Sequence, residues 1–176
     1  MGNLKIATRL YGGFAALVAV LVVMAALALA QMASINASTK TIIDDWLPGV
    51  EAANAISTAV ANLRVFEMQH VINASEAGMA ETEKSMAVAQ TNLDAARKAY
   101  EAAISSDEER KLYQTFSDGW AEYMKVHERV LGSSQRNSKA IARVVLEGES
   151  KKLYDASSGV LAQLIQFNHQ GSEASA

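Results

Sequence analysis

Arg64 is the side chain in this sequence best suited to hold a small charged ligand. It follows Val60 by four positions and precedes Glu67 by three, so the three residues share one face of a helix. A guanidinium group stays charged at any ordinary pH and presents a planar fork of donors that matches a carboxylate. Two interpretations are open: Arg64 contacts an anionic ligand, or it forms an ion pair with Glu67.

A second group of cations lies near a predicted chain reversal. Arg136 and Arg143 flank the start of the next helix, with Lys139 between them. If this reversal and Arg64 lie at the same end of a helical bundle, these cations form a positive pocket for an organic anion such as a dicarboxylate or an amino acid. The alternative is a solvated surface, the usual environment of charged side chains. Asn137 is a candidate for orienting the ligand or, alternatively, a helix cap.

Tyr123 and His127 complete the set of candidate ligand contacts, because they share the inward face of a predicted helix at a height similar to that of Arg64. For Tyr123 the alternative is a core aromatic residue with a hydrogen-bonded hydroxyl group. His70 lies three residues after Glu67, but one such pair is too little for a metal site, which needs several convergent ligands. We therefore expect no metal and no other cofactor.

The sequence does not indicate an enzyme. A di-metal four-helix enzyme needs Glu-x-x-His motifs on two helices, and only Glu67-Met-Gln-His70 fits that pattern. We find no arrangement of nucleophile and base and no glycine-rich phosphate loop. There is no cysteine, and with a net charge of −3 the charges are interspersed, which does not indicate a nucleic-acid-binding surface. A binding module is the expectation.

The elements that position these residues are predicted to be helices. Pro48 is the only proline, and Ala, Leu, Glu, Lys, Gln and Met, which favour helices, dominate the chain. Apolar residues recur at three- and four-residue spacing over four segments with short connections. These features predict an all-α, up-down-up-down antiparallel four-helix bundle. Its helices are expected at about 46–75, 79–104, 107–131 and 137–176.

Local signals set these boundaries. A new helix is expected to start near Trp46, capped by Asp44 or Asp45, or else a long helix kinks there. Ser106-x-x-Glu109 fits a capping box. The segment Asn73–Gly78 has the composition of a turn that ends in glycine. Asn137 or Ser138 is expected to cap the fourth helix, and Gly148 and Gly159 weaken the prediction that this helix is continuous.

An apolar segment precedes the bundle. Residues 11–30 contain no charge, and a helix of that length spans roughly 30 Å, the hydrocarbon thickness of a bilayer. Lys5 and Arg9 precede it, which predicts a cytoplasmic N-terminus at 1–10 and an exported domain at 31–176. The alternative is a signal peptide cleaved before Gln31. In the up-down-up-down order the fourth helix points back to the membrane, so we expect a second span beyond Ala176 and a chain that is part of a longer protein.

The sequence resembles the N-terminal half of methyl-accepting chemotaxis proteins, the bacterial chemoreceptors, over its whole length. The resemblance depends on the order and spacing of several short features rather than on any one of them. They are the basic start and single span (Lys5 to Ala30), Leu47-Pro48, Asn62-Leu63-Arg64, Trp120-Ala-Glu-Tyr123, Gly148-Glu-Ser150 and Leu164-Ile-Gln-Phe-Asn168.

The resemblance implies a transmembrane sensor in the bacterial inner membrane, with its four-helix-bundle sensor domain in the periplasm. It also implies a homodimer through the first and fourth bundle helices, small-molecule binding near the end far from the membrane, and a shift of the fourth helix toward a cytoplasmic signalling domain. The same input domain occurs on sensor kinases and cyclases, which remain alternatives, as does a secreted helical protein with a cleaved signal.

Overall fold

A computed structural model describes residues 6–174, and every element in it is helical. The elements are α1 (Ile6–Thr41), η1 (Ile42–Trp46), α2 (Leu47–Ile72), α3 (Glu76–Ala103), α4 (Asp107–Gln135), α5 (Lys139–Val145), η2 (Leu146–Ser150) and α6 (Lys151–Ala174). The predicted all-α four-helix bundle is confirmed, with α5, η2 and α6 together forming the fourth helix. The predicted cytoplasmic segment 1–10 lies partly outside the described residues.

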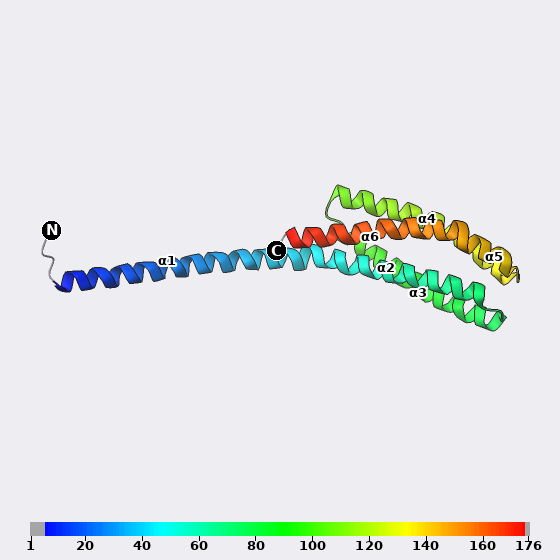
Figure 1. The fold of residues 1–176 in the computed structure, drawn as a ribbon, viewed down its shortest axis with the longest axis horizontal. Coiled ribbons are helices and arrows are strands. Elements are labelled where there is room, and N and C mark those ends of the chain that lie inside the picture. Colours follow the sequence, from blue (N-terminus) through cyan, green and yellow to red (C-terminus); the bar gives the residue numbers. More distant parts are fainter. Residues whose placement is uncertain (1–5, 175–176) are drawn as a thin grey trace.

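The helix α1 extends away from the bundle as one long rod (Figure 1). The chain runs outward in α2, back in α3, outward in α4 and back through α5 and α6, so we call the end far from α1 the distal end. The last turns of α6 lie beside the start of α2, where the rings of Trp46 and Phe167 are 6.4 Å apart. The fourth helix therefore returns to the place where α1 leaves the bundle.

One helical stretch in the described part of the chain is long and apolar enough to cross a membrane. Its most apolar window has a mean hydropathy of 2.7, and none of that window is buried against the rest of the molecule. The helix continues without interruption past Ala30, where the signal-peptide alternative places the cleavage site, to Thr41. Its length and exposure fit a lipid environment, in which apolar side chains need no protein partner.

No separate helix start occurs near Trp46, contrary to one of the two sequence predictions. The chain passes from α1 to α2 through a π turn, in which the Leu47 N–H donates to the Ile42 carbonyl. Pro48 lies in the first turn of α2, and Trp46 provides no side-chain cap. A proline removes one helical hydrogen bond and crowds the preceding turn, and a widened turn of this kind accommodates it without ending the helix.

The connection between α2 and α3 is shorter than the composition predicts. Ser75 accepts a hydrogen bond from the Gly78 N–H at 3.1 Å, so it is the N-cap of α3, which begins at Glu76 instead of Met79. Gly78 consequently lies in the first turn of this helix and does not end α2. A Cβ atom there would lie 2.2 Å from Nδ2 of Asn73, so a larger residue at this position would displace the Asn73 side chain.

The helix α4 extends to Gln135, four residues beyond the predicted end. Asn137 has a φ of 57°, a left-handed conformation that ends a helix, and the Ser138 N–H donates back to the Ser133 carbonyl at 3.0 Å. Asn137 is therefore the terminator of α4 and not the N-cap of the next helix. Ser138 precedes α5 without a capping hydrogen bond from its side chain.

At the membrane-proximal end, the predicted cap of α4 is present. The Ser106 hydroxyl group accepts from the Glu109 N–H at 3.2 Å. In a capping box the carboxylate accepts from the N–H of the N-cap residue, which is Ser106 here. The Glu109 carboxylate instead accepts from the N–H of the preceding residue, Ser105, at 2.9 Å.

The core is a column of large side chains in which α4 supplies the aromatic residues Phe116, Trp120 and Tyr123, all buried. In α5 the apolar residues Ile141 and Val144 are 59% and 72% exposed. Ala142 and Leu146 face inward.

Candidate ligand-sensing site

The carboxylate of Glu67 is the centre of a polar network buried within the bundle. Its side chain has no solvent exposure. It accepts hydrogen bonds from Arg64 Nη1 at 2.5 Å and from the Tyr123 hydroxyl group at 2.8 Å, and it meets His127 Nδ1 at 3.0 Å. The periodicity of α2 places Arg64 and Glu67 on its inward face, and that of α4 places Tyr123 and His127 opposite them. We call these four residues the Glu67 network.

Hydrogen bonds and charge keep Glu67 ionised despite its burial. Burial alone raises the pKa of a carboxyl group, but hydrogen bonds from His127 and Tyr123 and the positive charge of Arg64 outweigh it, so the pKa of Glu67 lies below its ordinary value. Because an ionised carboxylate only accepts, His127 Nδ1 carries the hydrogen of that bond.

Arg64 connects this network to the π turn of the fourth helix. Its Nη1 donates to the Ser150 hydroxyl group at 2.7 Å, and its Nη2 donates to the Leu146 carbonyl at 3.0 Å. Both acceptors belong to η2, and the Leu146 carbonyl also accepts from the Lys151 N–H of the π turn. The guanidinium carbon also lies 5.4 Å from the centre of the Tyr154 ring. A change at Glu67 or Arg64 therefore acts directly on the helix that returns to α1.

The six predicted ligand-binding residues fall into two groups. Arg64, Tyr123 and His127 meet at Glu67, so the ion-pair interpretation of Arg64 is the one that the structure shows. Arg136, Asn137 and Arg143 are exposed around the turn between α4 and α5, and they do not join Arg64 in one pocket. The Glu67 carboxylate, three residues away on the same helix, neutralises the Arg64 guanidinium. Arg64 therefore adds no net positive charge at the distal surface.

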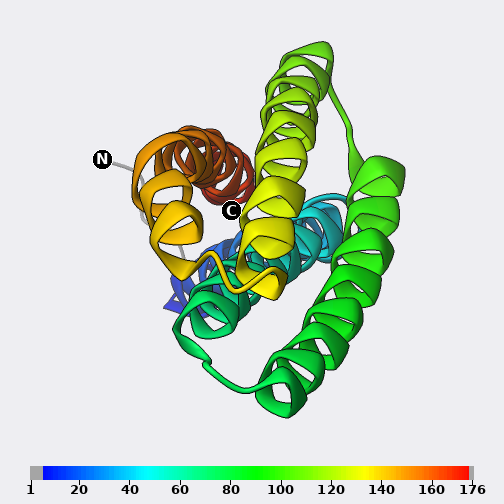
Figure 2. The ribbon, with the colours of Figure 1, turned by 90° about the vertical axis from the view of Figure 1, so that its right-hand side faces the viewer.

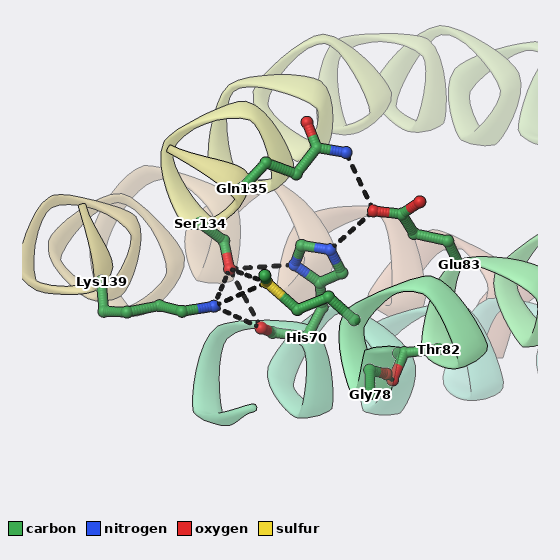
Figure 3. Close-up of polar contacts among 8 residues, drawn as sticks. His70, Gly78, Thr82, Glu83, Ser134, Gln135 and Lys139 are labelled. Carbon is green, nitrogen blue, oxygen red and sulfur yellow. Dashed lines mark hydrogen bonds and ion pairs between the residues drawn. The ribbon is translucent and has the colours of Figure 1, made fainter. Parts of the chain in front are cut away.

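A second polar cluster lies at the distal end, around the buried imidazole of His70 (Figure 3). His70 Nε2 lies 2.9 Å from a Glu83 oxygen of α3, and His70 Nδ1 lies 2.9 Å from the Ser134 hydroxyl group of α4. Gln135 also donates to Glu83, at 2.9 Å. These bonds from Gln135 and His70 lower the pKa of Glu83, which keeps it ionised at neutral pH.

Lys139, the first residue of α5, closes this cluster. Its Nζ donates to the Ser134 hydroxyl group at 2.6 Å and to the His70 carbonyl at 3.0 Å, as Figure 3 shows. Burial lowers the pKa of Lys139. These contacts fasten the start of the fourth helix to the end of α2, where the carbonyls of a helix lack partners within the helix.

A groove lies beside Lys139 on the distal surface. It has a volume of about 490 Å³ and is lined by Val71 of α2 and by Lys139, Ala140, Arg143 and Val144 of α5. Two cations and three apolar side chains suit an organic anion with an apolar part. Among the residues that the structure describes, no group of three or more His, Asp or Glu side chains is arranged to hold a metal ion.

Sequence reasoning missed several partners in these clusters, among them Glu83, Gln135 and two serines. Ser150 joins the Glu67 network only because η2 turns it inward, and Ser134 becomes buried because α4 continues past Leu131. Neither position carries a signal in the sequence, since serine is common on exposed helix surfaces. The three-residue spacing of Arg64 and Glu67 can be seen in the sequence. That Tyr123 and His127 converge on this pair can be seen only from the packing of α4 against α2.

We expect the bundle to lose stability in acid because of Glu67. The pKa of Glu67 is lowered in the folded state from its ordinary value of 4.5. Ionised Glu67 therefore adds to the free energy of unfolding above pH 4.5, and this stabilisation is lost as the pH falls through the lowered pKa. One proton taken up on unfolding corresponds to about 1.4 kcal/mol per pH unit. Thermal unfolding measured from pH 7 to pH 3 should show this loss. Glu67→Gln should give a flatter profile, and an unchanged slope would contradict the assignment.

Comparison with known proteins identifies a family and a similar sequence. The family of four-helix-bundle sensory modules for signal transduction matches residues 3–176. A Bacillus subtilis (strain 168) protein named YvaQ, described as a candidate sensory transducer, is 22% identical over 159 residues, which is 90% of this chain. The chain spans 28% of the length of that curated relative.

Proposed function

Because the chain belongs to the family of four-helix-bundle sensory modules for signal transduction, we propose that it is the ligand-binding region of a methyl-accepting chemotaxis receptor. In this proposal α1 crosses the bacterial inner membrane and the bundle lies in the periplasm. The protein acts as a binding module and not as an enzyme. The observation that carries the proposal is the return of α6 to the foot of α1, beside Trp46, while η2 is hydrogen-bonded to Arg64.

The proposed signal is a change in the packing of the fourth helix. A ligand shifts an equilibrium between two packings only by the difference in its affinity for them. The fourth helix touches the groove through Lys139 and Arg143, meets the Glu67 network through η2, and ends beside Trp46. A ligand that moves α5 therefore displaces the acceptors of Arg64 and changes where α6 meets the membrane.

The proposed ligand is an organic anion, bound in the groove beside Lys139 and Arg143. Arg143 is exposed, and Arg136 and Asn137 lie on the neighbouring turn, where they enlarge the positive surface. Arg64 and Tyr123 serve the signal through Glu67 instead of touching the anion. This assignment keeps the predicted ligand class but moves the main contacts to the start of the fourth helix.

The receptor is further proposed to be a homodimer through the first and fourth bundle helices. The distal half of α2 exposes Val65, Met68 and Ile72, which recur at three- and four-residue spacing. Ile141 and Val144 are exposed on α5, the element after the distal turn. Apolar side chains gathered on one region of a surface are typical of protein contacts, and a second copy that covers these residues explains why they are apolar.

We expect Arg143→Gln to weaken carboxylate binding by about tenfold or more, because a hydrogen bond to a charged group is worth about 1.5–3 kcal/mol. The measurement is calorimetric titration of the full chain in lipid nanodiscs with a series of mono- and dicarboxylates. Arg110→Gln, an exposed arginine near the start of α4, is the matched control and should leave the affinity unchanged. Failure of every carboxylate to bind, or equal affinity of both variants, would remove the anion from this groove.

A further inference from the structure

A second cavity, open to solvent on one side, lies in the distal half of the bundle, apart from the groove at Lys139. It has a volume of about 220 Å³ and lies between α2, α3 and α4. The backbone of α3 packs mainly on α2 and that of α4 mainly on the fourth helix, while α3 and α4 meet through side chains. Figure 2, which views the bundle from its distal end, shows these two helix pairs.

The walls of the cavity are mostly apolar and flexible. Leu63, Leu131, Met86 and Met124 contribute to them from three helices. Methionine adapts its shape to a bound group more readily than branched residues do. For scale, a cavity of about 150 Å³ holds a benzene molecule, so this one has room for a ring or a short branched chain together with a small polar head group.

The polar groups of the cavity are Glu83, Gln90 and His127, and the first two present acceptor oxygens. Glu83 is an ionised carboxylate. The Gln90 amide nitrogen donates to Asp94 at 2.9 Å, which leaves the buried Gln90 Oε1 without a partner among the described residues. His127 Nδ1 lies 3.0 Å from the Glu67 carboxylate, so this nitrogen is directed away from Glu83 and Gln90 toward the Glu67 network.

The Glu83 carboxylate and the Gln90 carbonyl oxygen select a ligand that donates hydrogen bonds. A buried carbonyl oxygen without a partner is destabilising, and a donor on the ligand would satisfy it. None of the side chains that line the cavity is a lysine or an arginine, so an organic anion would meet the Glu83 carboxylate with no compensating charge. A primary ammonium group supplies three donors and a positive charge.

We propose that the cavity between α2, α3 and α4 binds a small organic amine. Its ammonium group is held by the Glu83 carboxylate and the Gln90 carbonyl oxygen, and its apolar part lies against Met86, Met124 and Leu131. This site goes beyond the proposed anion groove, since it differs in place and in ligand charge. His127 belongs both to the cavity and to the Glu67 network, so an amine bound here acts on Arg64 and η2 through Glu67.

The test uses the full chain in lipid nanodiscs and three probes of similar shape. Benzylamine carries an ammonium group, benzyl alcohol is neutral and benzoate is anionic. In calorimetric titrations at neutral pH we expect saturable binding of one benzylamine per chain, at least about tenfold tighter than benzyl alcohol because of the contact with a charged group. Absence of benzylamine binding, or equal affinity for benzyl alcohol, would overturn the proposal.

Variants locate the binding within the cavity. Ala87 lines it from α3 and is exposed, so Ala87→Leu fills the space at a position that tolerates leucine in a helix. We expect Ala87→Leu to abolish benzylamine binding. Ala95→Leu, at an exposed position of the same helix outside the cavity, is the control and should bind as the unmodified chain does. Retained binding in Ala87→Leu would overturn the proposal.

Glu83→Gln tests the role of the charge, because glutamine keeps an acceptor for His70 while losing the carboxylate. We expect benzylamine affinity to fall by about tenfold or more, and unchanged affinity would contradict the proposal.

Benzoate distinguishes this cavity from the anion groove. Benzoate binding that Arg143→Gln weakens and Ala87→Leu leaves unchanged belongs to the anion groove, so either site can fail without the other.

Discussion

Replacement of Glu67 with leucine should destabilise the bundle by about 3–5 kcal/mol, since removing one partner of a buried ion pair leaves the other charge uncompensated. The variant leaves the Arg64 guanidinium in the interior with only Ser150 and the Leu146 carbonyl as acceptors. It also removes the acceptor of the buried Tyr123 hydroxyl group. Urea unfolding of the full chain in detergent micelles, followed by circular dichroism, measures the change.

The double variant Arg64→Met with Glu67→Leu is the control for this interpretation. It replaces both charges by apolar side chains of similar size, so we expect it to be more stable than Glu67→Leu alone. Full recovery is not expected, because Tyr123 and His127 still lose their acceptor. If the double variant is no more stable than Glu67→Leu, the loss arises from packing and not from the unpaired charge.

Replacement of Trp120 with alanine should cost about 3–5 kcal/mol, the range for removal of a large aromatic side chain from a core. Trp120 is 2% exposed and lies between two other rings of α4: its ring centre is 6.3 Å from that of Phe116 and 4.6 Å from that of Tyr123. The cavity left by alanine would remove these contacts and loosen the support of Tyr123, which donates to Glu67. The same urea titration measures the effect.

Trp120→Phe distinguishes packing from hydrogen bonding at this position. The buried Trp120 Nε1 has no acceptor among the described residues, so phenylalanine loses ring volume but no hydrogen bond. We expect its cost to be clearly smaller than that of alanine. Similar losses for the two variants would mean that the indole group makes a polar contact on which the bundle depends.

The fourth helix is held by buried carboxylates at two levels. In the distal half, Glu67 and Arg64 hold η2. At the membrane-proximal end, Glu109 is 1% exposed and accepts from the Tyr100 hydroxyl group at 2.8 Å and from Asn168 Nδ2 of α6 at 3.2 Å. Glu109 lies in the first turn of α4, where the partial positive charge of the helix end favours a carboxylate. A shift of the fourth helix must therefore rearrange specific buried hydrogen bonds, which favours discrete packings over continuous sliding.

The sequence alone determined the fold class, the number of bundle helices and most of the core. These properties depend on local signals: the period of apolar residues, the scarcity of proline, and caps such as Ser106. In α3, for example, Met86, Leu93 and Tyr100 follow one another at seven-residue intervals and are all buried, because a helix of regular pitch places residues about two turns apart on one face. The family resemblance came from several short sequence features, such as Leu47-Pro48 and Asn62-Leu63-Arg64, and is confirmed by the match over residues 3–176.

Only the tertiary structure decided the arrangement of polar groups. The π turn at Leu146–Ser150, which buries Ser150, could not be read from the sequence, because it depends on contacts with other helices. For the turn at Ile42–Trp46, Pro48 indicated a disturbance of the helix but not its form. Periodicity placed Arg64, Glu67, Tyr123 and His127 on inward faces, but whether Arg64 meets a ligand or a neighbour depends on distances of a few ångströms between helices. Such distances are set by the packing of the whole bundle, and no local pattern encodes them.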